Sequence, residues 1–480
     1  MGILNNAKWV AFSQVFKIIV QLVNIVYLAR LISPSEYGIM AMALVVINFG
    51  MLVRDLGTAA AIIQKKQLTD ELINAIFWMN LFMGIIIAGV ICAFSPLFSH
   101  LFHSPGLTPV LLLVSIIFPL SSSSATHLAL LERDSKFKSI SFIEIRSSVI
   151  SVILALLLAY NGFGVYSLVF QMITLTGLTT IQFWYISKWR PSLSMAFNFS
   201  HLKDILGFSV NLSLFNFINY FSRNADSIII GRYMSASVLG AYSLAYRIML
   251  FPLQSLTFVI SRSLFPVLSK NQDDHGNLRK IYLNCVFFIL FLVVPLMSGL
   301  AYISNPFVYF IFGDKWTLTA SILLWLAPTA IIQAVLSSTG TVFMAKGRTD
   351  VLFKLGLLGA FLYVSSFVIG VNFGIVNFAR FYFLANVINF FPAMFLLMKL
   401  IDGSLWILLK KCYLVFVIDM FMIVSMFVFN NFYPISYNNE YDFLNFLLTI
   451  LVGGGVYLIM ALVLIKDIRF FIANKIIAKN

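Results

Sequence analysis

Charged side chains are scarce in this chain of 480 residues: Asp, Glu, Lys and Arg make up 10% of it, against about 25% in an average soluble domain. Hydrophobic residues make up 61%, and apolar segments long enough to cross a bilayer recur from Trp9 to Ile465. This composition excludes an ordinary soluble protein. It predicts an all-α, polytopic membrane protein, because helices satisfy their own backbone hydrogen bonds inside lipid.

Cysteine is also scarce, and the three cysteines lie in apolar stretches without any paired spacing: Cys92, Cys285 and Cys412. They are typical of small buried hydrophobic residues and exclude a disulfide framework. Only Lys8 precedes the first apolar segment, which contains Lys17 and lacks a small-residue cleavage site. We therefore expect a retained helix at the start of the chain, not a signal peptide.

Enzyme and metal motifs are missing from the sequence, which has no HExxH, no Walker-type loop and no recognisable Ser–His–acid arrangement. The run Gly453–Gly455 lies inside an apolar segment, so it is typical of helix packing and not of a phosphate-binding loop. His100 and His103 share a short loop without further ligands. We predict no enzymatic activity, no metal site and no cofactor.

The formal net charge of +14 comes from basic residues scattered between the apolar segments. Such loop charges orient membrane spans and give no reason to expect nucleic-acid binding. Basic loops alternate with loops that carry little charge, which fits fourteen spans with both termini in the cytoplasm. The expected spans cover residues 8–30, 37–57, 73–98, 107–131, 140–160, 163–187, 206–230, 237–260, 281–303, 318–344, 352–371, 375–398, 405–430 and 443–465.

Two polar stripes lie within the first and seventh spans, and each member of the second follows its partner by 202 residues. The stripes are Gln14, Lys17, Gln21 and Asn24, and Asn216, Asn219, Arg223 and Asp226. Steps of three and four residues place each set on one face of a helix. Polar groups at this depth must face a partner helix or water. We therefore expect two equivalent helices that line one polar cavity.

The same offset aligns residues 28–41 (LARLISPSEYGIMA) with residues 230–243 (IGRYMSASVLGAYS). Six spans separate the copies, an even number, so the sequence predicts two parallel six-helix lobes related by a pseudo-two-fold axis along the membrane normal. The expected lobes are residues 1–200 and 201–402, and residues 403–480 add two further helices and a cytoplasmic tail. Ligand sites of such transporters lie between the lobes, near the midplane.

Basic residues outnumber acidic ones among the ionisable positions of the spans, which favours an anionic ligand. The expected substrate-binding residues are Lys17, Gln21, Asn24, Asn219, Arg223, Arg247 and Arg146. Asp226 and Glu144 are the acids expected to couple transport to H⁺ or Na⁺.

Structural roles remain open for several of these residues. The Gln and Asn side chains are also suited to interhelical hydrogen bonds. Glu144 with Arg146, and Arg223 with Asp226, are close enough in sequence to form structural ion pairs. Arg380, near the outer end of its span, and Asp419, outside the repeat, are further ionisable candidates.

Four segments carry a resemblance to a known family over essentially the whole chain: residues 28–43 (LARLISPSEYGIMAMA), 260–274 (ISRSLFPVLSKNQDD), 307–316 (FVYFIFGDKW) and 342–354 (VFMAKGRTDVLFK). In order and spacing they resemble the polysaccharide transporter family of the multidrug/oligosaccharidyl-lipid/polysaccharide exporter superfamily, in its colanic-acid-type branch. The resemblance implies an inner-membrane flippase that carries undecaprenyl-diphosphate-linked sugar units outward by alternating access. It also implies membrane lipids, a polysaccharide polymerase and export machinery as partners.

Three other functions compete with this interpretation. A multidrug or cation antiporter shares the architecture, but would favour acidic and aromatic cavity residues over the basic ones found here. A polymerase or ligase of the same pathway would need a large outer loop that bears arginine, and the longest expected outer loops, residues 304–317 and 431–442, are about a dozen residues long and contain no arginine. A scaffold without transport activity would tolerate loss of the buried charges.

Overall fold

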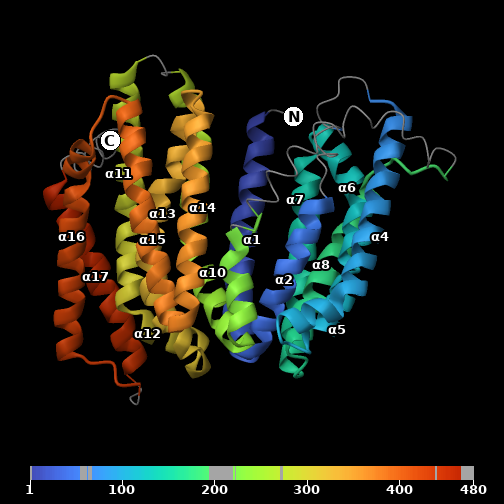
Figure 1. Ribbon diagram of the computed structural model, residues 1–480, viewed down its shortest axis with the longest axis horizontal. Helices are drawn as coiled ribbons and strands as arrows, with labels where there is room; N and C mark the ends of the chain where they lie inside the picture. Colours follow the sequence, from blue (N-terminus) through green and yellow to red (C-terminus); the bar gives the residue numbers. More distant parts are fainter. Residues whose placement is uncertain are drawn as a thin grey trace, which may run out of the picture. The chain divides into compact units, whose positions relative to one another are not determined.

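The computed structural model describes residues 3–54, 62, 68–193, 220–221, 223–270, 274–437 and 441–465, and gives the backbone alone at 3–8, 10–11, 253–267 and 269–270. Within these ranges the chain is helical and contains no strand (Figure 1). Eleven helical segments of this part are long and apolar enough to cross a membrane. The prediction of an all-α, multi-pass membrane protein is therefore confirmed.

The chain divides into two compact units, Met1–Gly240 and Ala241–Asn480. The helices that lie within the first unit are α1 (Ile3–Leu31), α2 (Pro34–Arg54), α4 (Asp70–Leu101), α5 (Leu107–Val114), α6 (Ile117–Arg133), α7 (Phe137–Tyr160) and α8 (Val165–Ile186). Residues 223–233 form a further helix of this unit. The predicted lobe boundary at residue 200 lies outside the described residues.

The second unit begins within α10 (Ala236–Lys270). Its remaining helices are α11 (His275–Tyr302), α12 (Ser304–Phe312), α13 (Thr317–Ala345), α14 (Thr349–Gly370), α15 (Ile375–Leu400), α16 (Leu405–Phe432) and α17 (Asp442–Leu464). Short 3₁₀ turns at Asp314–Trp316 and Val371–Phe373 precede α13 and α15. The predicted count of fourteen spans stays a prediction, because the seventh expected span lies largely outside the described residues.

Helix packing repeats between the two units. In the first unit α4 packs on α6, α6 on α8 and α7 on α8. In the second, α11 packs on α13, α13 on α15 and α14 on α15. Counted in chain order, the contacts between spans 3 and 4, 4 and 6, and 5 and 6 recur six spans later. The additional helices α16 and α17 pack on each other, and α16 also packs on α11. This pattern agrees with the predicted repeat and its two-helix extension.

Several helices begin where a short polar side chain accepts a hydrogen bond from the first turn. Thr69 accepts from the backbone N–H of Leu72 at the start of α4, at 3.3 Å. Asp274 accepts from the N–H of Asn277 at the start of α11, at 2.9 Å. These caps define helix starts at the points where polar loops give way to apolar runs.

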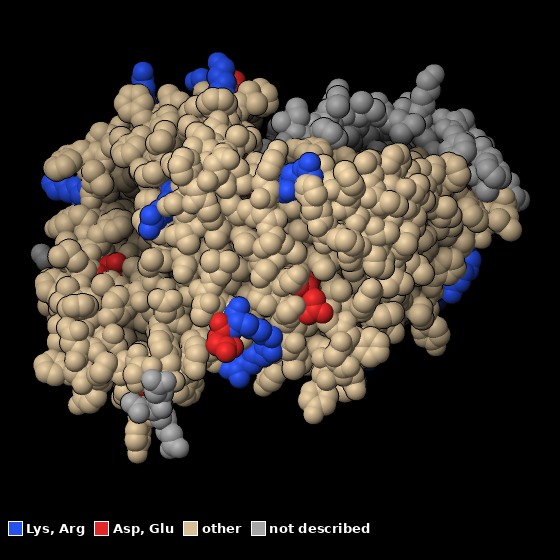
Figure 2. All heavy atoms as spheres, turned by 60° about the horizontal axis from the view of Figure 1, so that its bottom comes forward, with Lys and Arg blue, Asp and Glu red and all other residues tan. Residues whose placement is uncertain are grey.

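Large apolar side chains remain exposed along many helices, among them Phe82 at 62%, Leu157 at 58% and Phe361 at 69%. Figure 2 shows one face on which charged side chains form only a few small groups among uncharged residues. A surface of this kind is suited to hydrocarbon, since water-exposed proteins rarely carry large contiguous apolar patches.

Candidate functional site

The first polar stripe meets an acid on a neighbouring helix. Lys17 of α1 places its Nζ atom 2.7 Å from Oε2 of Glu144, which lies on α7. The two side chains are 32% and 35% exposed, so the pair is half-buried. Packing of α1 on α7 turns the striped face of α1 toward this acid. A predicted substrate ligand and a predicted ion-coupling acid are therefore brought together.

The stripe continues toward α8. The Asn24 side-chain amide donates to Oε1 of Gln171 at 3.5 Å, a long hydrogen bond. The Oδ1 atom of Asn24 is buried and has no hydrogen-bond partner among the described residues. Gln14 and Gln21 are exposed. Gln171 was missed by sequence reasoning, although a glutamine within an apolar segment is itself a signal.

Arg146 does not pair with Glu144 in this structure. Its side chain is exposed, and its guanidinium lies 5.7 Å from the centre of the Phe142 ring. Glu144 is bound to Lys17 instead, through a contact that joins two helices. The side chains of these two neighbours therefore make their contacts with different residues.

The second stripe is only partly described. Asn216 and Asn219 lie outside the described residues. Arg223 is exposed, whereas Asp226 is buried at 5% exposure and accepts a hydrogen bond from the N–H of Ser227 at 2.6 Å. The arginine is thus available to solvent or a ligand, and the acid is held within the fold.

Arg247 is a half-buried cation in α10, within the expected span 237–260. It makes no hydrogen bond or ion pair with any residue that the structure describes. The neighbouring Tyr242 and Tyr246 stack on each other with ring centres 5.9 Å apart. A cation at this depth requires an acid, water or a ligand. Arg247 is therefore suited to bind an anionic group.

Hydrogen bonds between buried or half-buried polar side chains join two helices of the second unit, α13 and α15. The Gln333 amide of α13 donates to the hydroxyl of Tyr382 at 2.6 Å and to Oδ1 of Asn386 at 3.3 Å, both on α15. Asn386 is fully buried and also donates to the carbonyl of Tyr382. Sequence reasoning missed this group, which is typical of interhelical hydrogen bonding.

The two further ionisable candidates have packing partners. The Arg380 guanidinium lies 4.9 Å from the centre of the Trp325 ring and donates to Asn377. Asp419 accepts a hydrogen bond from the hydroxyl of Ser298 at 2.6 Å, which links α16 to α11.

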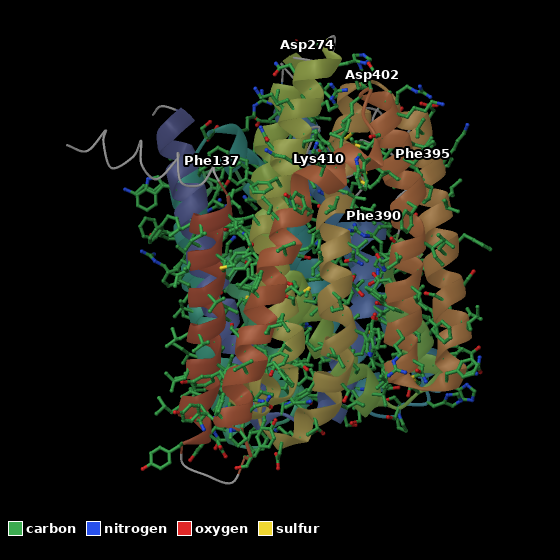
Figure 3. The ribbon with its side chains drawn as sticks, turned by 90° about the vertical axis from the view of Figure 1, so that its left-hand side faces the viewer. Phe137, Asp274, Phe390, Phe395, Asp402 and Lys410 are labelled. Carbon is green, nitrogen blue, oxygen red and sulfur yellow. The ribbon has the colours of Figure 1, made fainter. Side chains whose placement is uncertain are left out.

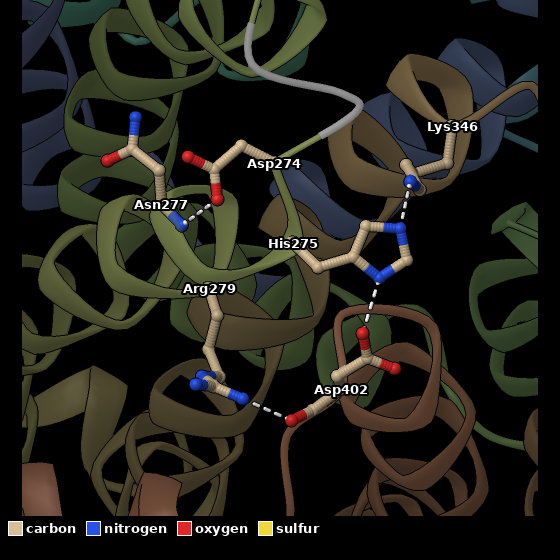
Figure 4. A network of polar contacts seen from close by, with 6 residues as sticks. All are labelled: Asp274, His275, Asn277, Arg279, Lys346 and Asp402. Carbon is tan, nitrogen blue, oxygen red and sulfur yellow. Dashed lines mark hydrogen bonds and ion pairs between the residues drawn. The ribbon is translucent and has the colours of Figure 1, made fainter.

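A second polar group lies at one end of the second unit, where Figure 3 labels Asp274 and Asp402. His275 Nδ1 is 2.6 Å from the Asp402 carboxylate, and the Lys346 ammonium is 2.9 Å from His275 Nε2 (Figure 4). Because an ammonium can only donate, Nε2 is the acceptor toward Lys346, and Nδ1–H then donates to the Asp402 carboxylate. Arg279 donates to the Asp402 carbonyl. These contacts connect three loops.

A further arginine in these loops, Arg348, has a raised pKa. Hydrogen bonding to the Asp350 carboxylate raises it above the ordinary value of an arginine.

Among the described residues there is no group of three or more His, Cys, Asp or Glu side chains arranged to hold a metal ion.

Comparison with known proteins places the chain among proteins of polysaccharide assembly. The profile of the polysaccharide biosynthesis protein family matches residues 27–321. The lipopolysaccharide biosynthesis protein WzxC of Escherichia coli K12 is 28% identical over 404 residues, which cover 84% of this chain and 82% of WzxC. The teichuronic acid biosynthesis protein TuaB of Bacillus subtilis is 27% identical over 406 residues, 84% of each chain.

Solved structures share the fold. The lipid II flippase MurJ, in an inward closed conformation, superposes with a TM-score of 0.76 at 16% identity and covers 95% of this chain and 99% of MurJ. An inward-facing MATE family transporter of the MOP superfamily has a TM-score of 0.57 at 13% identity, over 81% of this chain and 96% of its own. At these identities the likeness concerns the fold alone. Because the family profile matches more than half of its residues, this chain belongs to the polysaccharide biosynthesis protein family.

Proposed function

We propose that the chain is a flippase, not an enzyme, that moves an undecaprenyl-diphosphate-linked oligosaccharide across the bacterial inner membrane for surface polysaccharide assembly. The names of its relatives support this: one is a succinoglycan biosynthesis transport protein, ExoT of Rhizobium meliloti, 25% identical over 358 residues. MurJ, whose fold the chain shares, flips lipid II, as its name states. The substrate is thus a lipid-linked sugar.

The observation that carries the proposal is a cation within an expected membrane span that has no partner among the described residues. Arg247 is half-buried and unpaired among the described residues. A charged side chain at the centre of a span costs about 3 kcal/mol on insertion scales, which a bound anion would offset. A guanidinium fork matches two phosphate oxygens at once, so a diphosphate is the ligand that suits this residue.

Lys17 supplies a second cation, which is paired with Glu144 until substrate binds. The Glu144 carboxylate neutralises the Lys17 ammonium at 2.7 Å. An arriving diphosphate would take Lys17 and release Glu144, which then gains a proton or binds Na⁺. The proposed coupling thus uses Glu144, with Asp226 as a second acid.

The remaining assignments follow from the same proposal. Sugar and phosphate contacts fall to Gln21, Asn24, Arg146, Asn219 and Arg223. Basic loops orient the chain with both termini in the cytoplasm. The repeat divides it at about residues 200 and 402, and docking to a polymerase or to export machinery would follow transport.

Complementation of a deletion strain tests the proposal. Lys17→Ala, Arg223→Ala and Arg247→Ala are expected to lose surface polysaccharide and to accumulate lipid-linked units on the cytoplasmic face. Lys410→Ala, which removes an exposed charge in α16, is the matched control and should complement fully. Deletion without any change in surface polysaccharide would overturn the proposal. Efflux of cationic drugs, lost with the same variants, would favour the antiporter instead.

A further inference from the structure

Two repeat-equivalent hairpins meet backbone against backbone in the first unit. A Cβ atom added at Gly38 would overlap the carbonyl oxygen of Ala236, and one added at Gly240 would overlap the carbonyl oxygen of Pro34. The repeat offset of 202 residues converts Gly38 into Gly240 and Pro34 into Ala236. Each hairpin therefore contributes one glycine and one carbonyl oxygen to the contact, and the two sets of groups lie at equivalent positions of the repeat.

Such reciprocity is the mark of a two-fold contact, in which one residue touches a second and its equivalent touches the first. The two hairpins are therefore related by an approximate local two-fold axis at this contact. A Cβ atom at Gly240 would also lie 2.9 Å from the backbone nitrogen of Gly38, and both glycines are buried. Only residues without a side chain allow two helix starts to approach this closely.

Local structure around the contact is repeated as well. The Ser33 hydroxyl accepts from the N–H of Glu36 at 3.4 Å, and the Ser235 hydroxyl accepts from the N–H of Val238 at 3.3 Å. These residues also differ by 202 positions. Matched caps fix the first turns of α2 and α10 in the same geometry, so the two hairpins meet as preformed, equivalent surfaces.

We propose that the Gly38–Gly240 contact is the closed outer gate of the transporter. The inference rests on the proposed flippase function and orientation, which place both hairpins on the outer side. The striped helices lead directly into them: Asn24 lies about two helical turns before the end of α1 at Leu31. A contact at this position closes the outer end of those helices, and release of substrate requires the hairpins to separate.

Substitution of either glycine tests the gate. Gly38→Ala and Gly240→Ala should hold the hairpins apart, lower transport about tenfold and raise labelling of Ala41→Cys by an impermeant maleimide added outside, because Ala41 is buried one helical turn after Gly38. Gly89→Ala and Gly177→Ala are matched controls, because a Cβ atom at either position meets nothing within 4 Å. Unchanged labelling and transport in the gate variants, with folding intact, would overturn the proposal.

A cross-link supplies a test in which the glycines are retained. Ser35→Cys and Ser237→Cys are exposed, equivalent positions beside the contact. The experiment starts from a protein whose three free cysteines have been replaced: Cys92, Cys285 and Cys412. A short bis-maleimide should join the pair and stop transport, whereas a mono-maleimide should not.

The two proposals fail in different ways. Efficient transport by the cross-linked protein, or no cross-link at all, would refute the gate while the flippase function stands. A parent protein that carries no lipid-linked sugar would refute the function. The cross-link yield and the maleimide labelling would still show whether the hairpins form a closed contact and whether the alanine variants open it.

Discussion

The Lys17 ammonium and the Glu144 carboxylate, 127 residues apart in the chain, lie 2.7 Å from each other and join α1 to α7. About one third of each side chain is exposed, so solvent screening limits what the pair contributes to stability. If the pair is only structural, either arrangement of the two charges will serve. If Lys17 binds substrate, the cation must lie on α1. Exchanging their charges separates the two roles.

Reversal of the pair, with Lys17→Glu and Glu144→Lys together, should restore thermal stability but not transport. The reversed pair keeps the ion contact, yet it moves the cation from α1 to α7, away from the position where Lys17 would meet the diphosphate. Lys17→Ala alone should lower transport about tenfold or more. Unfolding temperature in detergent and flipping in proteoliposomes are the two measurements.

Glu144→Gln is the matched single variant. It frees Lys17 and should leave substrate binding intact or stronger, while it removes the dependence of transport on the ion gradient. A reversed pair that transports as well as the parent would show that the contact is structural only.

Arg247→Lys should weaken substrate binding several-fold, and Arg247→Ala should weaken it further. Lysine keeps the charge but loses the planar fork that holds two phosphate oxygens. Neither change should lower the unfolding temperature, because Arg247 has no ion pair or hydrogen bond within the described part of the chain. Binding of a lipid diphosphate probe to purified protein measures the effect.

Arg232→Ala is the control for arginine removal. Its guanidinium donates to the carbonyl of Leu101 at 2.7 Å and contacts His103. Its loss should therefore act on stability and leave the affinity for the probe unchanged. Equal affinity losses in Arg232→Ala and Arg247→Ala would remove the case for a specific ligand role.

Helix positions could be predicted from the sequence because apolar runs and polar interruptions fix them. The expected span 405–430 is α16 (Leu405–Phe432), and the expected span 443–465 is α17 (Asp442–Leu464). The expected span 107–131 is also found, at Leu107–Arg133, but its helix is interrupted between Val114 and Ile117, which divides it into α5 and α6. Pro119 then falls in the first turn of α6, where a missing N–H costs little.

Partners of the polar stripe could not be predicted, because periodicity defines a helix face but not what lies opposite. The sequence placed Lys17 on such a face, and only the fold brings Glu144 to it. The repeat offset likewise aligned Gly38 with Gly240. It gave no sign that the two equivalents touch each other, since an internal symmetry axis has no local sequence signature.

Asn74→Ala should destabilise the first unit by about 1–3 kcal/mol, because it removes two hydrogen bonds to the backbone of Ser192. The Asn74 amide donates to the Ser192 carbonyl at 2.8 Å, and its Oδ1 accepts from the Ser192 N–H at 2.7 Å. Trp78 donates to the same carbonyl at 3.0 Å. These bonds fasten the chain that follows α8 to α4. Thermal unfolding measures the loss.

Asn161→Ala is the matched control, since within the described part of the chain that exposed amide donates only to the Leu157 carbonyl of its own helix end. It should change the unfolding temperature little. If both variants unfold alike, the segment after α8 is not held by Asn74.

His275→Ala should lower the stability of the second unit by about 1 kcal/mol and leave transport unchanged. The ring bridges Lys346 and Asp402, and its loss leaves an ammonium and a carboxylate without their shared partner. The cost is small because both His275 and Asp402 are substantially exposed, at 40% and 67%. Asp402→Asn removes the charge but keeps the shape of the side chain. Asn also adopts the positive φ of 50° found at this position, and its amide oxygen still accepts from His275. The unfolding temperature of Asp402→Asn should therefore lie between those of the parent and His275→Ala. A loss of transport in His275→Ala without a loss of stability would contradict the structural role and assign these loops to the transport cycle.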